Sequence, residues 1–274
     1  VCRPYAVSPR LQSTLRVSRD VSGVTVCDNK LFVVCFSSNS ILVFGPNNKQ
    51  QTNIELQQLN TPCDIVCCTE TQQLFVAGRS RDSPHCVWRV SLDGQHIDKW
   101  LTNKSTSTTD WFPCSLSLTS RRLLVTSYAN NSLFLFGSDG VQLKHISLSN
   151  MEYLRHAVET SHETFIICHT ALQPQVSEVD VAGHVIRVYC DQQQLGSPSY
   201  LALDSDGRVL VADLHRVLLL NSRLELERVL LDTEHHQLAQ EPWRLCYVEQ
   251  TRQLIVASAS RDTSRTIQVY RIRE

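Results

Sequence analysis

Short apolar runs alternate with polar turns along the whole chain. The runs Lys30–Cys35, Gln73–Gly78, Arg122–Ser127 and Val209–Ala212 are almost continuous series of apolar residues. A continuous apolar run bounded by turn residues is typical of a strand that is buried on both faces. Apolar residues do not recur at helical spacing over any long segment, so the pattern predicts an all-β protein.

A four-strand unit recurs with a period of roughly 42 residues, which is the length of one propeller blade. The unit is clearest at Pro198–Asp204, Gly207–Asp213, Arg216–Leu220 and Leu224–Leu230. Six such units predict a six-bladed β-propeller, in which each four-stranded blade packs between two neighbours. We expect one propeller domain over residues 1–274, with blades near 20–59, 60–103, 110–150, 151–195, 196–238 and 239–274.

The last blade needs a strand from elsewhere, because its unit offers only three strands before Glu274. A spare strand, Ser13–Ser18, lies in the segment 11–18, ahead of the first blade. Pairing it with the strand that contains Tyr270 would complete the last blade and cover an exposed sheet edge. We therefore expect the N-terminal strand to close the ring.

The repeat resembles the NHL repeat. The segment Ala202–Asp213 is close to that family's strand-turn-strand pattern, and His215-Arg216-Val217 is similar to its loop motif, with Leu214 in place of the usual asparagine. The resemblance implies a six-bladed propeller related to the tripartite-motif NHL proteins and the Brat-like repressors, which bind protein or RNA through one face. Other six-bladed relatives are enzymes, so the fold alone does not decide the function.

The net charge of the chain affects whether a protein or a nucleic acid is the expected partner. The formal net charge is −1, from 26 basic and 27 acidic residues. Nucleic-acid binding would then depend on a local basic patch rather than on overall charge. A protein or peptide ligand is therefore favoured over single-stranded RNA.

The eleven cysteines point to a reducing compartment. Their number is odd, and several lie inside apolar strand runs, among them Cys27, Cys35 and Cys168. Free cysteine behaves as a small buried hydrophobe, whereas secreted disulfide scaffolds pair their cysteines evenly. We expect a cytoplasmic protein without membrane association, since no apolar run approaches the ~20 residues of a membrane helix. The chain starts at Val1 without methionine or signal region, which we interpret as an excised domain or a processed chain.

Arginines and aromatic residues gather where one propeller face is expected, at the starts of the first strands and in the loops between second and third strands. Arginine beside aromatic rings suits protein hot spots and single-stranded nucleic acid. Arg155 and Arg244, at what we take to be equivalent positions of the channel mouth, are the strongest ligand-binding candidates. The candidate set is Arg79, Arg81, Trp111, Tyr128, Arg155, His156, Tyr200, His215, Trp243 and Arg244. The aromatic members have the alternative of plugging the central channel and packing between blades.

The sequence carries no phosphate-binding glycine loop and no nucleophile elbow, so we expect a non-catalytic module without cofactor or metal. Two enzyme classes stay open as alternatives. A calcium-dependent hydrolase similar to gluconolactonase would need channel acids, for which Asp20, Asp110 and Glu241 are the nearest candidates. A zinc enzyme similar to the peptide-amidation lyase would need histidines from separate blades; His156, His169 and His215 are the residues available.

Overall fold

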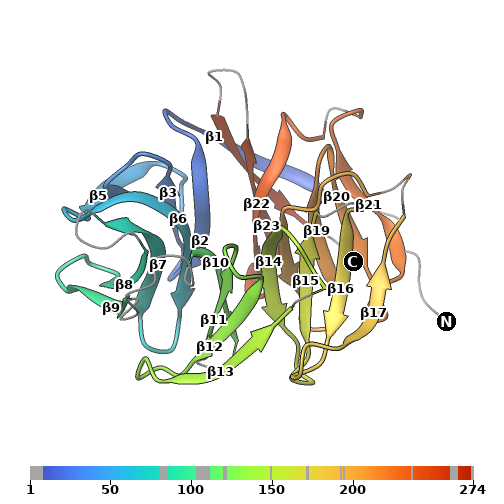
Figure 1. Ribbon diagram of the computed structural model, residues 1–274. Coiled ribbons are helices and arrows are strands. Elements are labelled where there is room, and N and C mark those ends of the chain that lie inside the picture. Colours follow the sequence, from blue (N-terminus) through green and yellow to red (C-terminus); the bar gives the residue numbers. More distant parts are fainter. Residues whose placement is uncertain are drawn as a thin grey trace.

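The computed structural model describes residues 9–80, 85–102, 112–119, 122–148, 150–170, 173–191, 193, 195–235, 237–259 and 265–272. Within these residues the chain forms six four-stranded antiparallel sheets, arranged as the blades of a propeller (Figure 1). The six-bladed fold predicted from the repeat is thereby confirmed. The one helical element is a single 3₁₀ turn, Glu249–Thr251, among the described residues.

The strands follow the repeat in chain order. Blades one and two contain β2 (Val21–Cys27), β3 (Lys30–Cys35), β4 (Ser40–Phe44), β5 (Gln50–Glu55), β6 (Leu59–Cys68), β7 (Gln73–Ser80), β8 (Cys86–Ser91) and β9 (Ile97–Thr102). Blades three and four contain β10 (Pro113–Thr119), β11 (Arg122–Ser127), β12 (Ser132–Phe136), β13 (Gln142–Ser147), β14 (Leu154–Glu159), β15 (Phe165–His169), β16 (Gln175–Val179) and β17 (Val185–Tyr189). Blades five and six contain β18 (Tyr200–Leu203), β19 (Val209–Asp213), β20 (Arg216–Leu220), β21 (Leu226–Asp232), β22 (Glu241–Val248), β23 (Gln253–Ala259), β24 (Arg265–Arg271) and the N-terminal β1 (Arg10–Val17).

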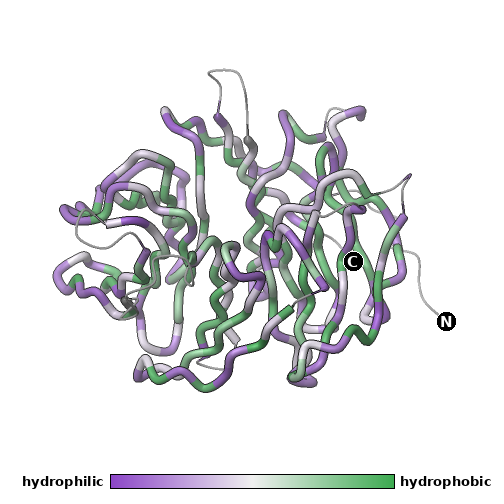
Figure 2. The backbone as a smooth tube through the Cα atoms, viewed as in Figure 1, coloured by the Kyte–Doolittle hydropathy of each residue, from purple (hydrophilic) through white to green (hydrophobic). Residues whose placement is uncertain are grey.

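The hydrophobic core lies between the blades rather than inside any one of them. Figure 2 shows apolar segments along the strands and polar segments at the turns. The described residues form six apolar clusters, each shared by two neighbouring blades; one, for example, joins Phe32 of blade one to Leu74 of blade two. Each second strand is buried on both faces, because it packs against a neighbour on either side.

The ring closes through the N-terminal strand, as predicted. β1 pairs antiparallel with β24, with Thr14 opposite Gln268 and Leu15 opposite Ile267. The side chains of Leu15 and Val17 are buried in the cluster between blades six and one. No helix within the described part of the chain is long and apolar enough to cross a membrane.

The two faces of the propeller differ in their connections. One, here called the loop face, carries the loops between second and third strands and the connections from one blade to the next, such as residues 35–40 and 55–59. The other, here called the turn face, carries tight turns, such as residues 159–165 and 203–209. The candidate ligand-binding residues are expected on the loop face.

Removing β1 should open the ring. We predict that deleting residues 1–17 lowers the free energy of unfolding by about 3–6 kcal/mol, since two buried side chains contribute about 1.5–3 kcal/mol each. Urea unfolding followed by circular dichroism measures the loss. Deleting residues 1–8 leaves β1 whole and serves as the control. An unchanged midpoint in the longer deletion would contradict the closure.

Candidate functional site

A ring of six residues surrounds the propeller axis just inside the loop face. The first strands of five blades have a register shift near their start, at Ser22, Cys63, Cys114, Arg155 and Trp243, each of which is skipped in the pairing. The residues that follow these bulges are Gly23, Asp64, Ser115, His156 and Arg244, and Tyr200 takes the corresponding place at the start of β18. We call these six residues the axial ring.

Asp64 is the acidic member of the axial ring, and its side chain is fully buried. Its carboxylate accepts hydrogen bonds from the backbone N–H groups of Ile65 and Leu116, both at 2.9 Å. The hydroxyl of Tyr200, which comes from the far side of the axis, lies 3.2 and 3.1 Å from the two carboxylate oxygens. Burial raises the pKa of Asp64 to about 6, and the Arg244 guanidinium opposes this shift. The carboxylate is therefore ionised near neutral pH.

Gly23 makes room for this carboxylate. A Cβ at position 23 would lie 2.8 Å from Oδ1 of Asp64 and 2.7 Å from the backbone nitrogen of Ile65. Contacts this short do not occur without movement of the backbone. A glycine in the axial ring is therefore required by the close approach of blades one and two.

His156 is buried in the axial ring and stacks on Tyr200, with ring centroids 3.7 Å apart. The backbone N–H of Leu201 donates to Nδ1 at 3.3 Å, so Nδ1 carries no proton. Nε2 then holds the proton and donates to the carbonyl of Leu116 at 3.1 Å. Burial lowers the pKa of His156 to about 3, and the nearby Arg244 charge adds to the shift. The imidazole is neutral and has no nitrogen left for a ligand.

Arg244 of blade six contacts residues of blades one, two and five. Its Nε donates to the carbonyl of Ser22 at 2.7 Å, and its Nη2 donates to the carbonyl of Cys63 at 3.4 Å. The guanidinium lies over the rings of Tyr200 and Trp243, 5.2 and 4.7 Å from their centroids. Only 7% of this residue is exposed, so its charge is balanced by Asp64, carbonyl dipoles and aromatic faces.

The axial ring does not suit a metal. Calcium prefers several oxygen ligands, whereas the one carboxylate of the ring already accepts hydrogen bonds from its neighbours and faces an arginine. Zinc would need a free imidazole nitrogen, and both nitrogens of His156 are engaged. Within the described residues no group of three or more histidine, cysteine, aspartate or glutamate side chains could hold an ion. The ring instead links the blades through polar contacts across the axis.

A row of aromatic rings, two half-buried and two exposed, extends over blades two to four on the loop face. His85 and Phe112 have centroids 4.4 Å apart, Phe112 and Tyr128 6.3 Å, and Tyr128 and Tyr153 5.9 Å. We call these four residues the aromatic strip. Arg79 lies over the Phe112 ring at 5.3 Å from its centroid. A contiguous row of partly exposed rings beside a cation is typical of a recognition surface.

Backbone strain contributes to the position of the strip. Tyr153 has a φ of 55°, in the left-handed region that bulky residues rarely adopt. Tyr153 is 49% exposed and Tyr128 is 39% exposed. Burial and the charge of Arg79 lower the pKa of His85, so this member of the strip is neutral at pH 7.

The ten predicted ligand-binding residues separate into distinct environments. Arg79 and Tyr128 lie at the aromatic strip, and Arg155 is exposed at the bulge of β14. His156, Tyr200 and Arg244 are buried in the axial ring, with Trp243 half-buried beside them. His215 lies at the surface, with Nδ1 3.9 Å from a carboxylate oxygen of Glu241. Arg81 and Trp111 fall outside the described residues.

The strand registers correct one expectation. Arg155 and Arg244 are not at equivalent positions, because Arg155 is a bulge residue whereas Arg244 follows a bulge. Arg155 therefore corresponds to Trp243, and Arg244 corresponds to His156. The one-residue difference turns Arg155 toward solvent and Arg244 into the channel. His169 is also buried, with Nε2 3.1 Å from the hydroxyl of Ser177.

Sequence reasoning missed Asp64 as the axial carboxylate and Tyr153 as the end of the strip. Asp64 lies inside the apolar segment Cys63–Cys68 and was counted as part of a strand. Aligning the six first strands on their second-strand partners would have placed it in the same ring as His156 and Arg244. Tyr153 carries no comparable sequence signal, since a left-handed tyrosine is rare.

Comparison with known proteins shows the fold and no family. No protein-family model matches the chain, and no curated protein matches its sequence. A gluconolactonase from Xanthomonas campestris is similar with a TM-score of 0.73 and 11% identity over 96% of this chain and 95% of that one. The PQQ-bound aldose sugar dehydrogenase of Streptomyces coelicolor has a TM-score of 0.72 and 9% identity over 98% and 99% of the two chains. The WD40 propeller domain of Doa1 has a TM-score of 0.68 and 15% identity over 97% and 98%.

These neighbours include enzymes and a WD40 domain, so they leave binding and catalysis equally open. The NHL-like repeat stays a prediction, because no family model supports it.

The acid response of stability tests the protonation states in the axial ring. Between pH 6.5 and about 3, His156 is protonated in the unfolded chain but stays neutral in the folded protein. Lowering the pH through this range therefore favours unfolding. Asp64 acts in the opposite sense, since the folded state holds its proton up to about pH 6 and the unfolded chain releases it above 3.8. When the pH falls from 7 to 5, the free energy of unfolding of His156→Gln should rise by about 2 kcal/mol relative to that of wild type. The free energy of unfolding of Asp64→Asn should fall by about 1 kcal/mol relative to that of wild type. Urea unfolding at both pH values measures these differences. Identical acid responses in wild type and His156→Gln would contradict the neutral, buried imidazole.

The partnership of Arg244 and Asp64 gives a second prediction. Arg244→Met removes the nearby cation that keeps the pKa of Asp64 from rising further, and it also removes hydrogen bonds to the buried carbonyls of Ser22 and Cys63. It should lower the free energy of unfolding by about 3–5 kcal/mol. Arg155→Met, at the exposed bulge residue of β14 outside the axial ring, should change it by no more than about 0.5 kcal/mol. The double variant Arg244→Met/Asp64→Asn should lose less free energy of unfolding than the two single variants lose together. Additive losses would show that the two side chains do not interact.

Proposed function

We propose that this propeller is a non-catalytic recognition module that binds a protein or peptide segment through the aromatic strip on its loop face. The observation that carries the proposal is the contiguous row from His85 to Tyr153, with half-exposed tyrosines and a cation over one ring. Tyrosine and arginine are enriched among the residues that dominate protein interfaces. The axial ring behind the strip supports this role, since it fixes the first strands that hold the loops.

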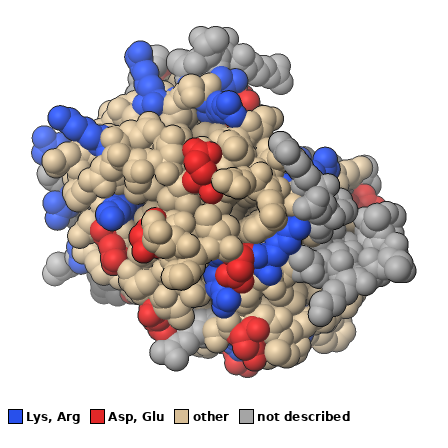
Figure 3. Space-filling view, turned by 90° about the vertical axis from the view of Figure 1, so that its left-hand side faces the viewer, with Lys and Arg blue, Asp and Glu red and all other residues tan. Residues whose placement is uncertain are grey.

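The tilt of the rings favours a peptide over single-stranded RNA. Successive rings of the strip are inclined to each other by 53°, 59° and 48°. Stacked bases need parallel platforms, whereas prolyl, aliphatic and aromatic side chains pack between inclined rings. Charge supports the same choice. On the flank that carries β5 and β9, basic and acidic side chains are interspersed (Figure 3), and the formal net charge is −1.

Arg79 and Arg155 give the strip its polar complement. Arg79 is held against Phe112, which limits the conformations that binding must fix. Arg155 is exposed near the axis, beyond the Tyr153 end of the strip. We infer that they donate to carbonyl or carboxylate oxygens of the bound segment. The resemblance to NHL propellers, which use one face for protein or RNA, is consistent with this site.

A selection experiment tests the proposal. A random peptide library is selected on the immobilised wild-type protein, and the selected peptides are titrated against wild type and Tyr128→Ala/Tyr153→Ala. The double variant should bind at least about tenfold more weakly, a loss of about 1.4 kcal/mol. Leu143→Ala, an exposed apolar residue of β13 on the outer rim, is the matched control and should bind as wild type.

Two results would contradict the proposal. Selected peptides that bind the double variant as well as wild type would place recognition elsewhere. Salt-sensitive binding of a labelled random RNA pool that is lost in the double variant, with no peptide binding, would identify the strip as an RNA site.

A further inference from the structure

Three successive rings of the aromatic strip are almost evenly spaced. The centroids of Phe112 and Tyr128 are 6.3 Å apart, and those of Tyr128 and Tyr153 are 5.9 Å apart. In an extended strand every second side chain lies on the same face, and these side chains recur about every 6.6–6.8 Å. The spacing of the rings therefore matches the side chains of an extended segment that lies along the strip.

Other backbone conformations fit this row less well. A polyproline II helix presents the same face only at every third residue, or about every 9.3 Å. An α-helix repeats a side chain after about 6 Å, at positions i and i+4, but its diameter of about 10–12 Å suits a broad groove. In the described part of the chain the strip is a single row, in which each ring contacts the ring before and the ring after it.

The two ends of the row differ in charge. Arg79, at the Phe112 end, is exposed, and none of the described residues forms an ion pair with it. At the Tyr153 end, Glu152 and Arg155 are both exposed, so one charge of each sign lies there. An acidic group of a ligand is therefore favoured at the Arg79 end alone.

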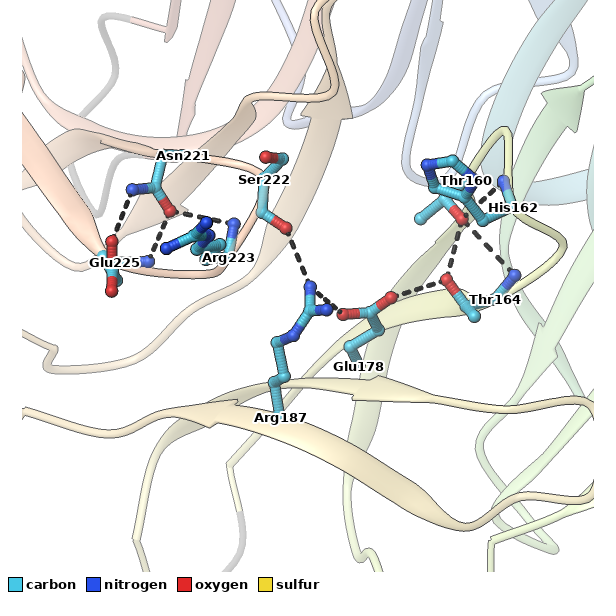
Figure 4. A network of polar contacts seen from close by, with 9 residues as sticks. All are labelled: Thr160, His162, Thr164, Glu178, Arg187, Asn221, Ser222, Arg223 and Glu225. Carbon is cyan, nitrogen blue, oxygen red and sulfur yellow. Dashed lines mark hydrogen bonds and ion pairs between the residues drawn. The ribbon is translucent and has the colours of Figure 1, made fainter. Parts of the chain in front are cut away.

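Arg187 on the turn face shows the contrast, because its charge is already balanced (Figure 4). It pairs with Oε2 of Glu178 at 3.0 Å and donates to the carbonyl of Ser222 at 3.1 Å. The guanidinium of Arg79 instead lies over the Phe112 ring, 5.3 Å from the centroid. A cation–π contact is an attraction between the whole guanidinium charge and the ring, so it leaves N–H donors for a carboxylate.

We infer that the aromatic strip recognises an extended segment of a partner protein in which two apolar residues and one acidic residue occupy alternate positions. The inference rests on the binding function proposed above and adds the conformation and the residue pattern of the bound segment. The apolar side chains cover Tyr153 and Tyr128, the two exposed rings. The next side chain on the same face reaches Phe112, where its carboxylate binds Arg79. The residues between these three positions face solvent.

A symmetric peptide tests the pattern for both chain directions at once. Terminally blocked, fluorescein-labelled Glu-Thr-Leu-Thr-Leu-Thr-Glu is titrated with the whole chain, and fluorescence anisotropy follows the binding. We expect saturable binding below about 1 mM. The permuted peptide Glu-Leu-Thr-Thr-Thr-Leu-Glu has the same composition but places its leucines four residues apart, as on a helix. It should bind at least about tenfold more weakly, and so should the symmetric peptide with lysine in place of both glutamates.

Three variants of the protein assign the contacts. Tyr128→Ala/Tyr153→Ala should bind the symmetric peptide at least about tenfold more weakly than wild type. Arg79→Glu should reverse the preference between the glutamate and lysine peptides. Arg223→Glu makes the same change of charge at an exposed arginine of the turn face and should leave both affinities unchanged.

The outcomes distinguish this inference from the function on which it rests. Suppose that the symmetric peptide does not bind at up to about 1 mM, whereas peptides selected from the random library lose affinity in Tyr128→Ala/Tyr153→Ala. The residue pattern would then be wrong and the binding function would stand. Equal affinities for the symmetric and permuted peptides would overturn the extended conformation, and equal affinities for the glutamate and lysine peptides would overturn the role of Arg79. Undiminished binding of every peptide by Tyr128→Ala/Tyr153→Ala would overturn both proposals.

Discussion

Every blade of this propeller depends on having a neighbour on both sides. A four-stranded sheet with two apolar faces is unstable in water unless both are covered, and here each of the apolar clusters belongs to two blades. The ring meets this requirement only when its first and last blades touch. β1 provides that contact from the far end of the chain, and the burial of the remaining blades depends on it.

The axis of the ring presents a different constraint. Six first strands converge there, and their side chains need to fill a narrow space without leaving polar groups unpaired. A glycine, an aspartate, a serine, a histidine, a tyrosine and an arginine fill it in this protein. The Tyr200–Asp64 contact crosses the axis, whereas Arg244 and His156 contact neighbouring blades. The same contacts that stabilise the centre also fill it. The binding function proposed above therefore rests on the periphery, at the aromatic strip.

The fold was predictable because its signal is repeated. Apolar second strands recur in every blade, and one clear unit, Pro198–Leu230, is enough to align the others. The site was only partly predictable because its geometry depends on single-residue shifts. A bulge ahead of Arg244 turns this side chain inward, whereas Arg155 is itself the bulge residue and stays outside. No periodicity in the sequence separates these two cases, since a register shift of one residue reverses the direction of a side chain without changing composition.

The pairing of β1 with β24 also sets the order of events during synthesis. The strand that closes the ring is made first, and its partner is made last, about 250 residues later. At ribosomal rates of roughly 5–20 residues per second, β1 waits on the order of 10–50 seconds for β24 to emerge. During this interval the growing chain presents apolar blade surfaces and an unpaired strand to the cell. Folding of this protein in vivo is therefore coupled to whatever shields nascent chains at the ribosome, although the finished ring needs no such protection.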